Sequence, residues 1–363
     1  MPTRPWLRWL VPFAAVLAIA ATTLVAGNAS ADEKLPPRSA EQLLVDLQQA
    51  EVHGFSGNVQ QSADLGIPAL PAMGEQGSDF SSLVSGTHTL RVAYANPHKS
   101  KVALLGDLSE SSVIRNGSDV WTWSSNDNAV THATIDPTSD RGSQAEQAPT
   151  DAPKTPQEAA TRFLTAVGPT TDVAVATDTT VAGRPAYELV LTPKQTGSLL
   201  SSVRIAVDGT EHVALRVQVF AGDRAEPVAA IGFTKVDFAT PAASEFAFTP
   251  PQGAKVTEVT PEDHAGQGSD ARTAPEPKVV GEGWTTVVVG TLPQGDLPDA
   301  KPDEQGGERG PDLQAYLAQL PKVSGSWGSG RLLAGTAFSV VITDDGRVAA
   351  GAVGPELLYD ALG

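Results

Sequence analysis

The stretch GRPAYELVL, residues 183–191, decides the fold, because apolar and polar side chains alternate along it as they do in a half-buried β-strand. Tyr187, Leu189 and Leu191 are two residues apart and therefore lie on one face of the predicted strand. A second alternating run follows at 203–207. Because most connections between such runs are short, we predict antiparallel strands in one sheet.

Alternating segments of the same kind extend in both directions from this stretch, and few helical segments interrupt them. Ser39 is a typical N-cap for a helix predicted over 39–49, and a capping box that begins at Thr155 predicts a second helix to about residue 167. The expected fold class is mainly β (α+β), with one open or half-closed sheet and helices on one side. The predicted strands cover residues 52–61, 86–95, 101–105, 111–116, 120–124, 129–135, 172–181, 187–191, 203–207, 215–219 and 228–238.

The N-terminal segment has the pattern of a secretory signal peptide. Arg4 and Arg8 form a basic start, an apolar run covers 9–27, and the small residues Ala29-Ser30-Ala31 follow. We predict export and cleavage after Ala31. The alternative is an uncleaved membrane anchor, because the apolar run is almost long enough to span a bilayer.

Composition excludes several kinds of partner and site. The chain has 363 residues, a formal net charge of −17 and no cysteine. A chain this acidic is repelled by phosphate backbones, so nucleic acid is not an expected partner. Without cysteine there are no disulfides, thiolate metal sites or cysteine nucleophiles.

No motif of a known catalytic type occurs in the chain. The sequence lacks a Gly-x-Ser-x-Gly elbow, a Walker loop and a His-Glu-x-x-His pair. The six histidines are scattered, and no two have the local spacing of metal ligands. We therefore predict no catalytic residue, no metal and no cofactor.

Apolar side chains that share a strand face are the candidates for a ligand-binding wall. Trp121 and Trp123 are two residues apart on one predicted strand, and large aromatic side chains on one face either fill a core or line a cavity. Which face of each strand points inward stays open, because a register shift of one residue exchanges the faces. The predicted wall consists of four same-face sets: Leu90, Val92 and Tyr94; Trp121 and Trp123; Leu189 and Leu191; Ile231 and Phe233.

Several phrases of the sequence, in their order, resemble those of LolA-like proteins, the carriers of lipoproteins across the periplasm. The phrases are FSGNVQQ (55–61), GTHTLRV (86–92) leading to NPHK (96–99), NGSDVWTW (116–123), GRPAYELVL (183–191) and FAFTPPQG (246–253). The same order occurs in the N-terminal domain of RseB, a relative that senses envelope stress by binding an anti-sigma factor. The resemblance spans about residues 39–260. It implies an incomplete, curved antiparallel β half-barrel, covered by helices around a hydrophobic cavity.

The chain departs from the resemblance at its C-terminal end, where residues 279–363 have no counterpart in short carriers. Three short strands and two short helices are expected there, one helix beginning at Asp312 and the other after Pro355. So few apolar positions bury little surface, and we expect this α+β appendage to pack on the half-barrel and not to fold alone. The expected division is a signal peptide at 1–31, the LolA-like half-barrel at 32–260, a linker at 261–278 and the appendage at 279–363.

The expected function is that of an exported, non-enzymatic protein that binds a lipid, an acyl chain or a lipidated partner in a hydrophobic cavity. One alternative is an RseB-like regulator whose partner is a membrane anti-sigma factor. The other alternative is an exported hydrolase with an unrecognised site.

Overall fold

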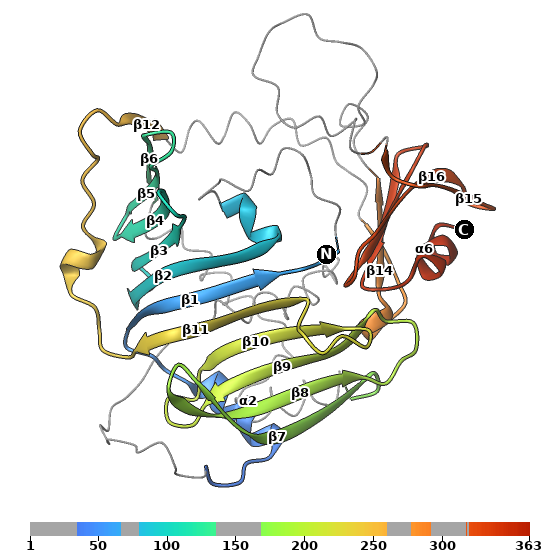
Figure 1. The fold of residues 1–363 in the computed structure, drawn as a ribbon, viewed down its shortest axis with the longest axis horizontal. Coiled ribbons are helices and arrows are strands. Elements are labelled where there is room, and N and C mark those ends of the chain that lie inside the picture. The colour runs from blue at the N-terminus through green and yellow to red at the C-terminus, as the bar shows by residue number, and fades with distance from the viewer. Residues whose placement is uncertain (1–34, 67–79, 136–167, 260–276, 292–316, 318) are drawn as a thin grey trace, which may run out of the picture.

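The computed structural model describes residues 35–66, 80–135, 168–259, 277–291, 317 and 319–363, which form two β-sheets (Figure 1). The signal segment, the helix predicted over 155–167 and most of the predicted linker lie outside the described residues, as does most of the helix predicted from Asp312. The larger sheet, here the main sheet, has twelve strands, and the small sheet has six.

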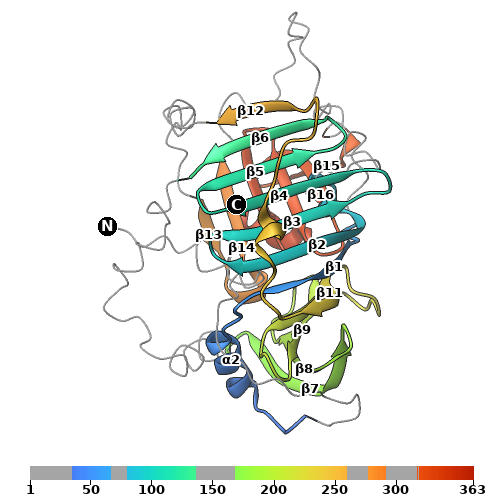
Figure 2. The same ribbon diagram turned by 90° about the vertical axis from the view of Figure 1, so that its left-hand side faces the viewer.

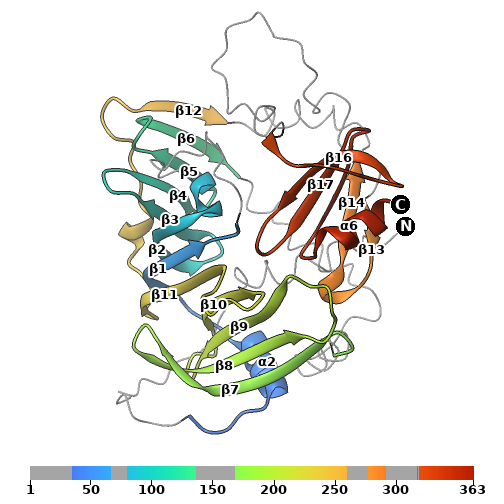
Figure 3. The ribbon, with the colours of Figure 1, turned by 45° about the vertical axis from the view of Figure 1, so that its right-hand side comes forward.

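The main sheet confirms the expected fold class of a mainly β, incomplete half-barrel. Its strands run in the order β12-β6-β5-β4-β3-β2-β1-β11-β10-β9-β8-β7, and the two end strands do not meet, so the sheet is an open, curved half-barrel (Figures 1 and 3). Neighbouring strands are antiparallel except β12, which pairs in parallel with β6. The strands are β1 (Phe55–Ala63), β2 (Gly86–Asn96), β3 (Lys99–Leu105), β4 (Glu110–Asn116), β5 (Asp119–Ser124), β6 (Ala129–Thr134), β7 (Thr171–Val181), β8 (Arg184–Pro193), β9 (Leu200–Asp208), β10 (Ala214–Ala221), β11 (Ala229–Asp237) and β12 (Lys255–Val259).

Local sequence explains both the hairpins and the first helix. Strands β7 and β8 are joined by Ala182 and Gly183, whose φ angles of 52° and 77° match the left-handed turns that suit the twist of a hairpin. Helix α2 (Ala40–Gln49) begins with the predicted cap: the Ser39 hydroxyl accepts from the Gln42 amide, and the Gln42 side chain accepts from the Ser39 amide. The cap was readable in the sequence because it depends only on neighbours along the chain.

Helix α2 and the short helix η2 (Phe80–Val84) pack on the same face of the main sheet, which is its concave face. Leu43 of α2 is fully buried against Tyr187 and Leu189 of β8. Phe80 and Leu83 of η2 pack against a cluster centred on Leu90 of β2. The pairing register connects β8 to β2 through β9, β10, β11 and β1 and places these residues on one face. Figures 1 and 3 show η2 inside the curve of the sheet.

The segment after β11 covers the opposite, convex face. The short helix η5 (Ala243–Phe246) contacts β3 and β4, and Phe246 is buried. Figure 2 shows this segment crossing the outside of β2 to β5 on its way to β12. The segment FAFTPPQG at 246–253 therefore leads into an additional edge strand, β12, which was not among the strands predicted from the sequence.

The small sheet contains more strands than the three expected. Its order is β13-β14-β18-β17-β16-β15. The Gly-rich run at 325–331 forms most of a hairpin, whose turn carries the buried Trp327. The strands are β13 (Lys278–Val280), β14 (Val287–Thr291), β15 (Lys322–Gly325), β16 (Gly328–Ala334), β17 (Ser339–Thr343) and β18 (Arg347–Gly351), with helix α6 (Pro355–Leu362) after them.

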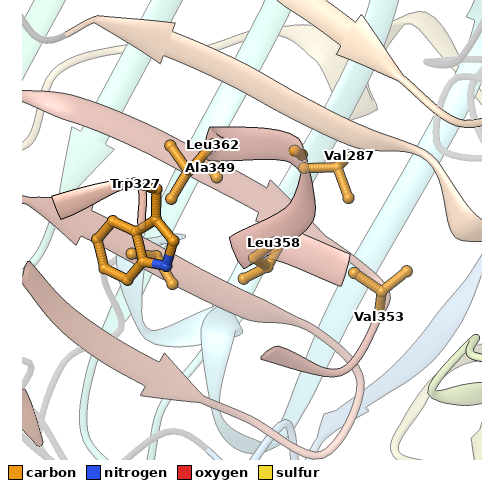
Figure 4. Close-up of a cluster of buried hydrophobic side chains, with 8 residues drawn as sticks. Val287, Trp327, Ala349, Val353, Leu358 and Leu362 are labelled. Carbon is orange, nitrogen blue, oxygen red and sulfur yellow. The ribbon is translucent and has the colours of Figure 1, made fainter. Parts of the chain in front are cut away.

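Helix α6 covers one face of the small sheet and builds a core there. Leu358 and Leu362 of the helix lie among side chains of the sheet and its turns (Figure 4). Trp327 stacks on Tyr359 of the helix with ring centroids 5.4 Å apart. The core consists of Val287, Trp327, Val341, Ala349, Val353, Leu358, Ala361 and Leu362.

The small sheet is attached to the main sheet at several places. The Leu199 amide donates to the Ala352 carbonyl at 2.8 Å, and the Trp284 indole N–H donates to the Thr171 hydroxyl at 2.7 Å. Ala337, in the turn between β16 and β17, belongs to a buried cluster with residues of the main sheet. These contacts join the two sheets through backbone, polar and apolar groups.

We predict that residues 279–363 do not fold when expressed alone. Separation exposes the cluster around Ala337 and removes the hydrogen-bond acceptor of Trp284, and a unit this small has little stability to lose. Circular dichroism of the isolated fragment, with the full chain as control, should show no cooperative thermal transition. A cooperative transition would identify the fragment as an independent domain.

Candidate functional site

All the predicted wall residues except the two tryptophans share the concave face of the main sheet. Cross-strand partners connect them in steps: Leu191 opposes Val203, Leu189 opposes Ile205, and Val217 opposes both Ile205 and Ile231. The path continues from Ile231 and Phe233 through β1 to β2. The structure therefore brings together Leu90, Val92, Tyr94, Leu189, Leu191, Ile231 and Phe233 on one surface, which we call the concave apolar face.

Trp121 and Trp123 lie on the convex face instead. In the register from β2 to β5, Val92 opposes Val102, Val102 opposes Val113, and Val113 opposes Thr122. Thr122 thus shares the face of Val92, and the tryptophans on either side of it point the other way. The prediction that the two tryptophans belong to the same wall as the other sets is therefore wrong. The face on which they lie depends on the strand register, which is set by the turns between the strands.

The convex side of Trp121 is occupied by protein. Its ring stacks on the His132 ring with centroids 3.8 Å apart, and Phe248 lies 5.5 Å away. Of the two roles considered for this aromatic face, these contacts favour core packing.

The concave apolar face is only partly covered by the described residues. Leu90 and Leu189 are buried, whereas Val92, Tyr94, Leu191, Ile231 and Phe233 are half-buried. The face also includes half-buried residues that were not among the predicted wall residues: Val203, Ile205, Val217 and Val219. Their alternation along β9 and β10 was the available signal.

The concave apolar face is also free of acidic side chains. The chain has 42 Asp and Glu residues, yet no residue of the described strands β1 to β11 that pairs on this face is Asp or Glu. Burial raises the pKa of Tyr94, whose ring stacks on Phe55 at 5.6 Å. A surface of this kind accepts hydrocarbon and disfavours cations.

A shallow hollow of about 270 Å³ lies elsewhere, where β8 and β9 meet the small sheet. Its lining includes Gln195, Ser198 and Asp223. We prefer the concave apolar face as the candidate site, because an acyl chain gains nothing from such polar groups.

The described residues show no group of three or more His, Asp or Glu side chains arranged to hold a metal ion. Among the helices in the described part of the chain, none has the length and apolar character needed to cross a membrane.

His132 connects the edge strand β12 to the rest of the main sheet. Its two ring nitrogens lie 2.9 Å from an Asp119 oxygen and 2.7 Å from a Glu258 oxygen, so the ring bridges β5 and β12. Burial lowers the pKa of His132, but the hydrogen bonds to Asp119 and Glu258 outweigh it, and the pKa lies above its ordinary value. The protonated imidazole donates from both nitrogens, so it is the form that both carboxylates stabilise.

This arrangement predicts that the edge of the main sheet weakens as the pH rises. Because the folded-state pKa of His132 is raised, its contribution is complete below the ordinary pKa of 6.5 and is lost as the pH rises through the raised pKa. Wild-type stability in urea should therefore fall more between about pH 6 and about pH 9 than that of His132→Gln, which cannot be protonated. Equal pH dependence of the two proteins would contradict a protonated bridge.

Comparison with known proteins gives distant structural similarities. No family model matches the chain, and no curated protein matches it. One chain in the solved complex of MucA and MucB from Pseudomonas aeruginosa is 13% identical to this chain. The match covers 89% of this chain and 96% of the matched chain, with a TM-score of 0.43. A LolA superfamily protein from Nitrosomonas europaea is 9% identical, with coverages of 58% and 99% and a TM-score of 0.22.

An uncharacterized conserved protein from Thermus thermophilus is 10% identical, covers 61% of this chain and 99% of that chain, and has a TM-score of 0.34. MucB and LolA superfamily structures are thus among those to which this chain is similar. All these TM-scores are below 0.5, so nothing about function is transferred from these proteins.

Proposed function

We propose that this protein is an exported, non-enzymatic binding protein that holds the acyl chain of a lipid or lipidated partner against its concave apolar face. The observation that carries the proposal is the row of apolar side chains across β8 to β2, in which most members are only half-buried and none is a carboxylate. Contiguous apolar surface that stays partly exposed is typical of a binding site. Export rests on the N-terminal pattern of residues 1–31.

The proposed wall keeps most of the residues expected from the sequence. Leu90, Val92 and Tyr94 contribute one side, and Ile231 and Phe233 the middle. Leu189 and Leu191 contribute the other side, where α2 covers part of the face. An acyl chain along this wall gains free energy at about 25 cal/mol per Å² of apolar surface removed from water.

Native mass spectrometry of the full protein, purified from its own host, tests the proposal directly. We expect a co-purifying lipid, and we expect the delipidated protein to bind a fluorescent polyene fatty acid with about 1:1 stoichiometry. Ile231→Glu should weaken this binding about tenfold or more, because it places a carboxylate on the apolar wall. Failure of the folded wild-type protein to bind the fatty acid would overturn the proposal.

A second candidate function is that of an RseB-like regulator of a membrane anti-sigma factor. Strand β7 favours it: β7 is 11 residues long and forms one edge of the main sheet, where an extended segment of a partner could pair with it. A sigma and anti-sigma gene pair beside the gene for this protein would supply the partner to test. Binding of that partner's extracytoplasmic part that is unaffected by Pro substitutions in β7 would exclude pairing at this edge.

A further inference from the structure

The small sheet has a second face that α6 does not cover, and it is apolar. Cross-strand pairing sets Val279 opposite Val288, Val288 opposite Ala350, and Ala350 opposite Val340. Leu333 of β16 completes the row opposite Val340. We call this row of five residues the inner row of the small sheet.

The inner row differs in burial from the face that α6 covers. Val341 and Ala349 on the α6 face are fully buried. In the inner row Val288 is 39% exposed, and the other members are half-buried. The two faces have similar composition, so a covering element accounts for the difference.

The inner row is turned toward the concave apolar face of the main sheet. Helix α6 lies on the side of the small sheet that is turned away from the main sheet. The opposite face of the small sheet faces the concave side of the main sheet (Figures 1 and 3). Viewed from the convex side, the small sheet lies directly behind β2 to β5 (Figure 2). The contacts at Leu199, Thr171 and Ala337 hold this orientation.

The two apolar faces meet where Val219 packs in one cluster with Ala337 and Phe338, but the rest of the two faces does not pack as the layers of a sandwich do. Sheets in direct contact lie about 10 Å apart, and their inner side chains are buried by interdigitation. Here Val340 and Leu333 on one side, and Ile231 and Phe233 on the other, all remain half-buried. Such an arrangement leaves both faces available to one apolar ligand.

Charge indicates the chemistry of that ligand. On its own face of the described small sheet, the inner row is bordered by the paired residues Gly290, Val348, Ile342, Arg331 and Lys322. One carboxylate, that of Asp344, lies beyond Ile342 and accepts from the Ser329 hydroxyl. Arg331 and Lys322 nonetheless place two cations beside the row, in a chain of net charge −17. The combination is complementary to hydrocarbon that carries an anionic head.

We propose that the inner row of the small sheet is the second wall of the acyl-binding site, so that the chain of an anionic amphiphile lies between the two sheets. This rests on the proposed function of the main sheet and gives the C-terminal region a role in it. Val288 and its neighbours contact the hydrocarbon from the side opposite Ile231. The ligand thereby removes apolar surface of both sheets from water.

Binding of the fluorescent fatty acid to the full chain tests the second wall. Val288→Glu should weaken binding about tenfold or more, by placing a carboxylate against hydrocarbon. The matched control is Val256→Glu: Val256 is a strand valine with 44% exposure, on β12, and its replacement should leave binding unchanged. Thermal melting of both variants checks that they are folded.

A contact measurement keeps the test valid if Val288→Glu does not fold. Val288→Trp introduces a fluorophore into the inner row, and stearic acid brominated in mid-chain should quench the added emission. The emission added by Val256→Trp should not be quenched. Quenching at both positions, or at neither, would overturn the second wall.

The outcomes separate this proposal from the function on which it rests. Loss of binding in both Ile231→Glu and Val288→Glu supports two walls. Loss in Ile231→Glu alone overturns the second wall and leaves the proposed function standing. A folded wild-type protein that binds no fatty acid overturns both.

Discussion

Replacing Asp208 by alanine is expected to destabilise the main sheet by about 3–5 kcal/mol, because it leaves a partly buried guanidinium without its carboxylate. Asp208, at the end of β9, is 1% exposed. Its carboxylate accepts from Arg184 Nε at 2.5 Å and Nη2 at 3.0 Å. The hydrogen bond to Asp208 is the main reason that the pKa of Arg184 is raised.

Asp208 also orders the turn that follows β9. Its Oδ1 accepts from the backbone amides of Thr210 at 2.9 Å and Glu211 at 2.7 Å. Alanine removes these bonds together with the ion pair, so the turn and the start of β8 lose support at the same time. The residue acts on stability, and fatty-acid binding by the remaining folded protein should be unchanged.

Urea unfolding measures this effect, and Asp172→Ala is the matched control. Asp172 pairs with Lys194 at 3.2 Å but has a 70% exposed side chain, so its loss should cost less than about 1 kcal/mol. If the two variants were equally stable, the Arg184–Asp208 pair would not hold the main sheet together.

The strands were largely predictable from sequence, because alternation and turn residues act locally. The N-cap at Ser39 and the alternation in β8 both depend on neighbours within a few residues. Alternation also predicts which residues of one strand share a face. This is why every predicted same-face set is intact within its own strand in the structure.

The relation between faces of distant strands was not predictable in the same way. It depends on register, and the register shifts between Tyr94 and Asn96 and again between Asn58 and Val59. Each of these irregularities changes which side chains oppose each other across two strands. The local sequence pattern does not predict where such an irregularity occurs. The tryptophans on β5 were therefore grouped with residues that lie on the other face.

Short strands with few apolar residues were missed for a different reason. Strand β12 has five residues and is exposed along most of its length, so its sequence carries little alternation. The Gly-rich run at 325–331 forms strands because Trp327 anchors its turn in the core with α6. That core gathers residues from the whole of 287–362, which local reasoning cannot see.

Replacing Trp121 by alanine is expected to cost about 3 kcal/mol of stability, the lower end of the range for a core aromatic, since its side chain is only half-buried. The loss comes from two ring contacts, with His132 at 3.8 Å and Phe248 at 5.5 Å. Both partners belong to the packing that joins β6 and the segment before β12 to the convex face. Fatty-acid binding should be unchanged, because Trp121 is on the face opposite Val92 and Ile231.

Urea unfolding and fatty-acid titration of the same Trp121→Ala protein separate the two roles of this ring. Ile231→Glu is the reference, since it should weaken binding through the concave face. A Trp121→Ala protein of normal stability that had lost fatty-acid binding would place the ligand on the convex face. Reduced stability with intact binding is the outcome that the register requires, because a side chain on one face of a sheet cannot contact a ligand held against the other.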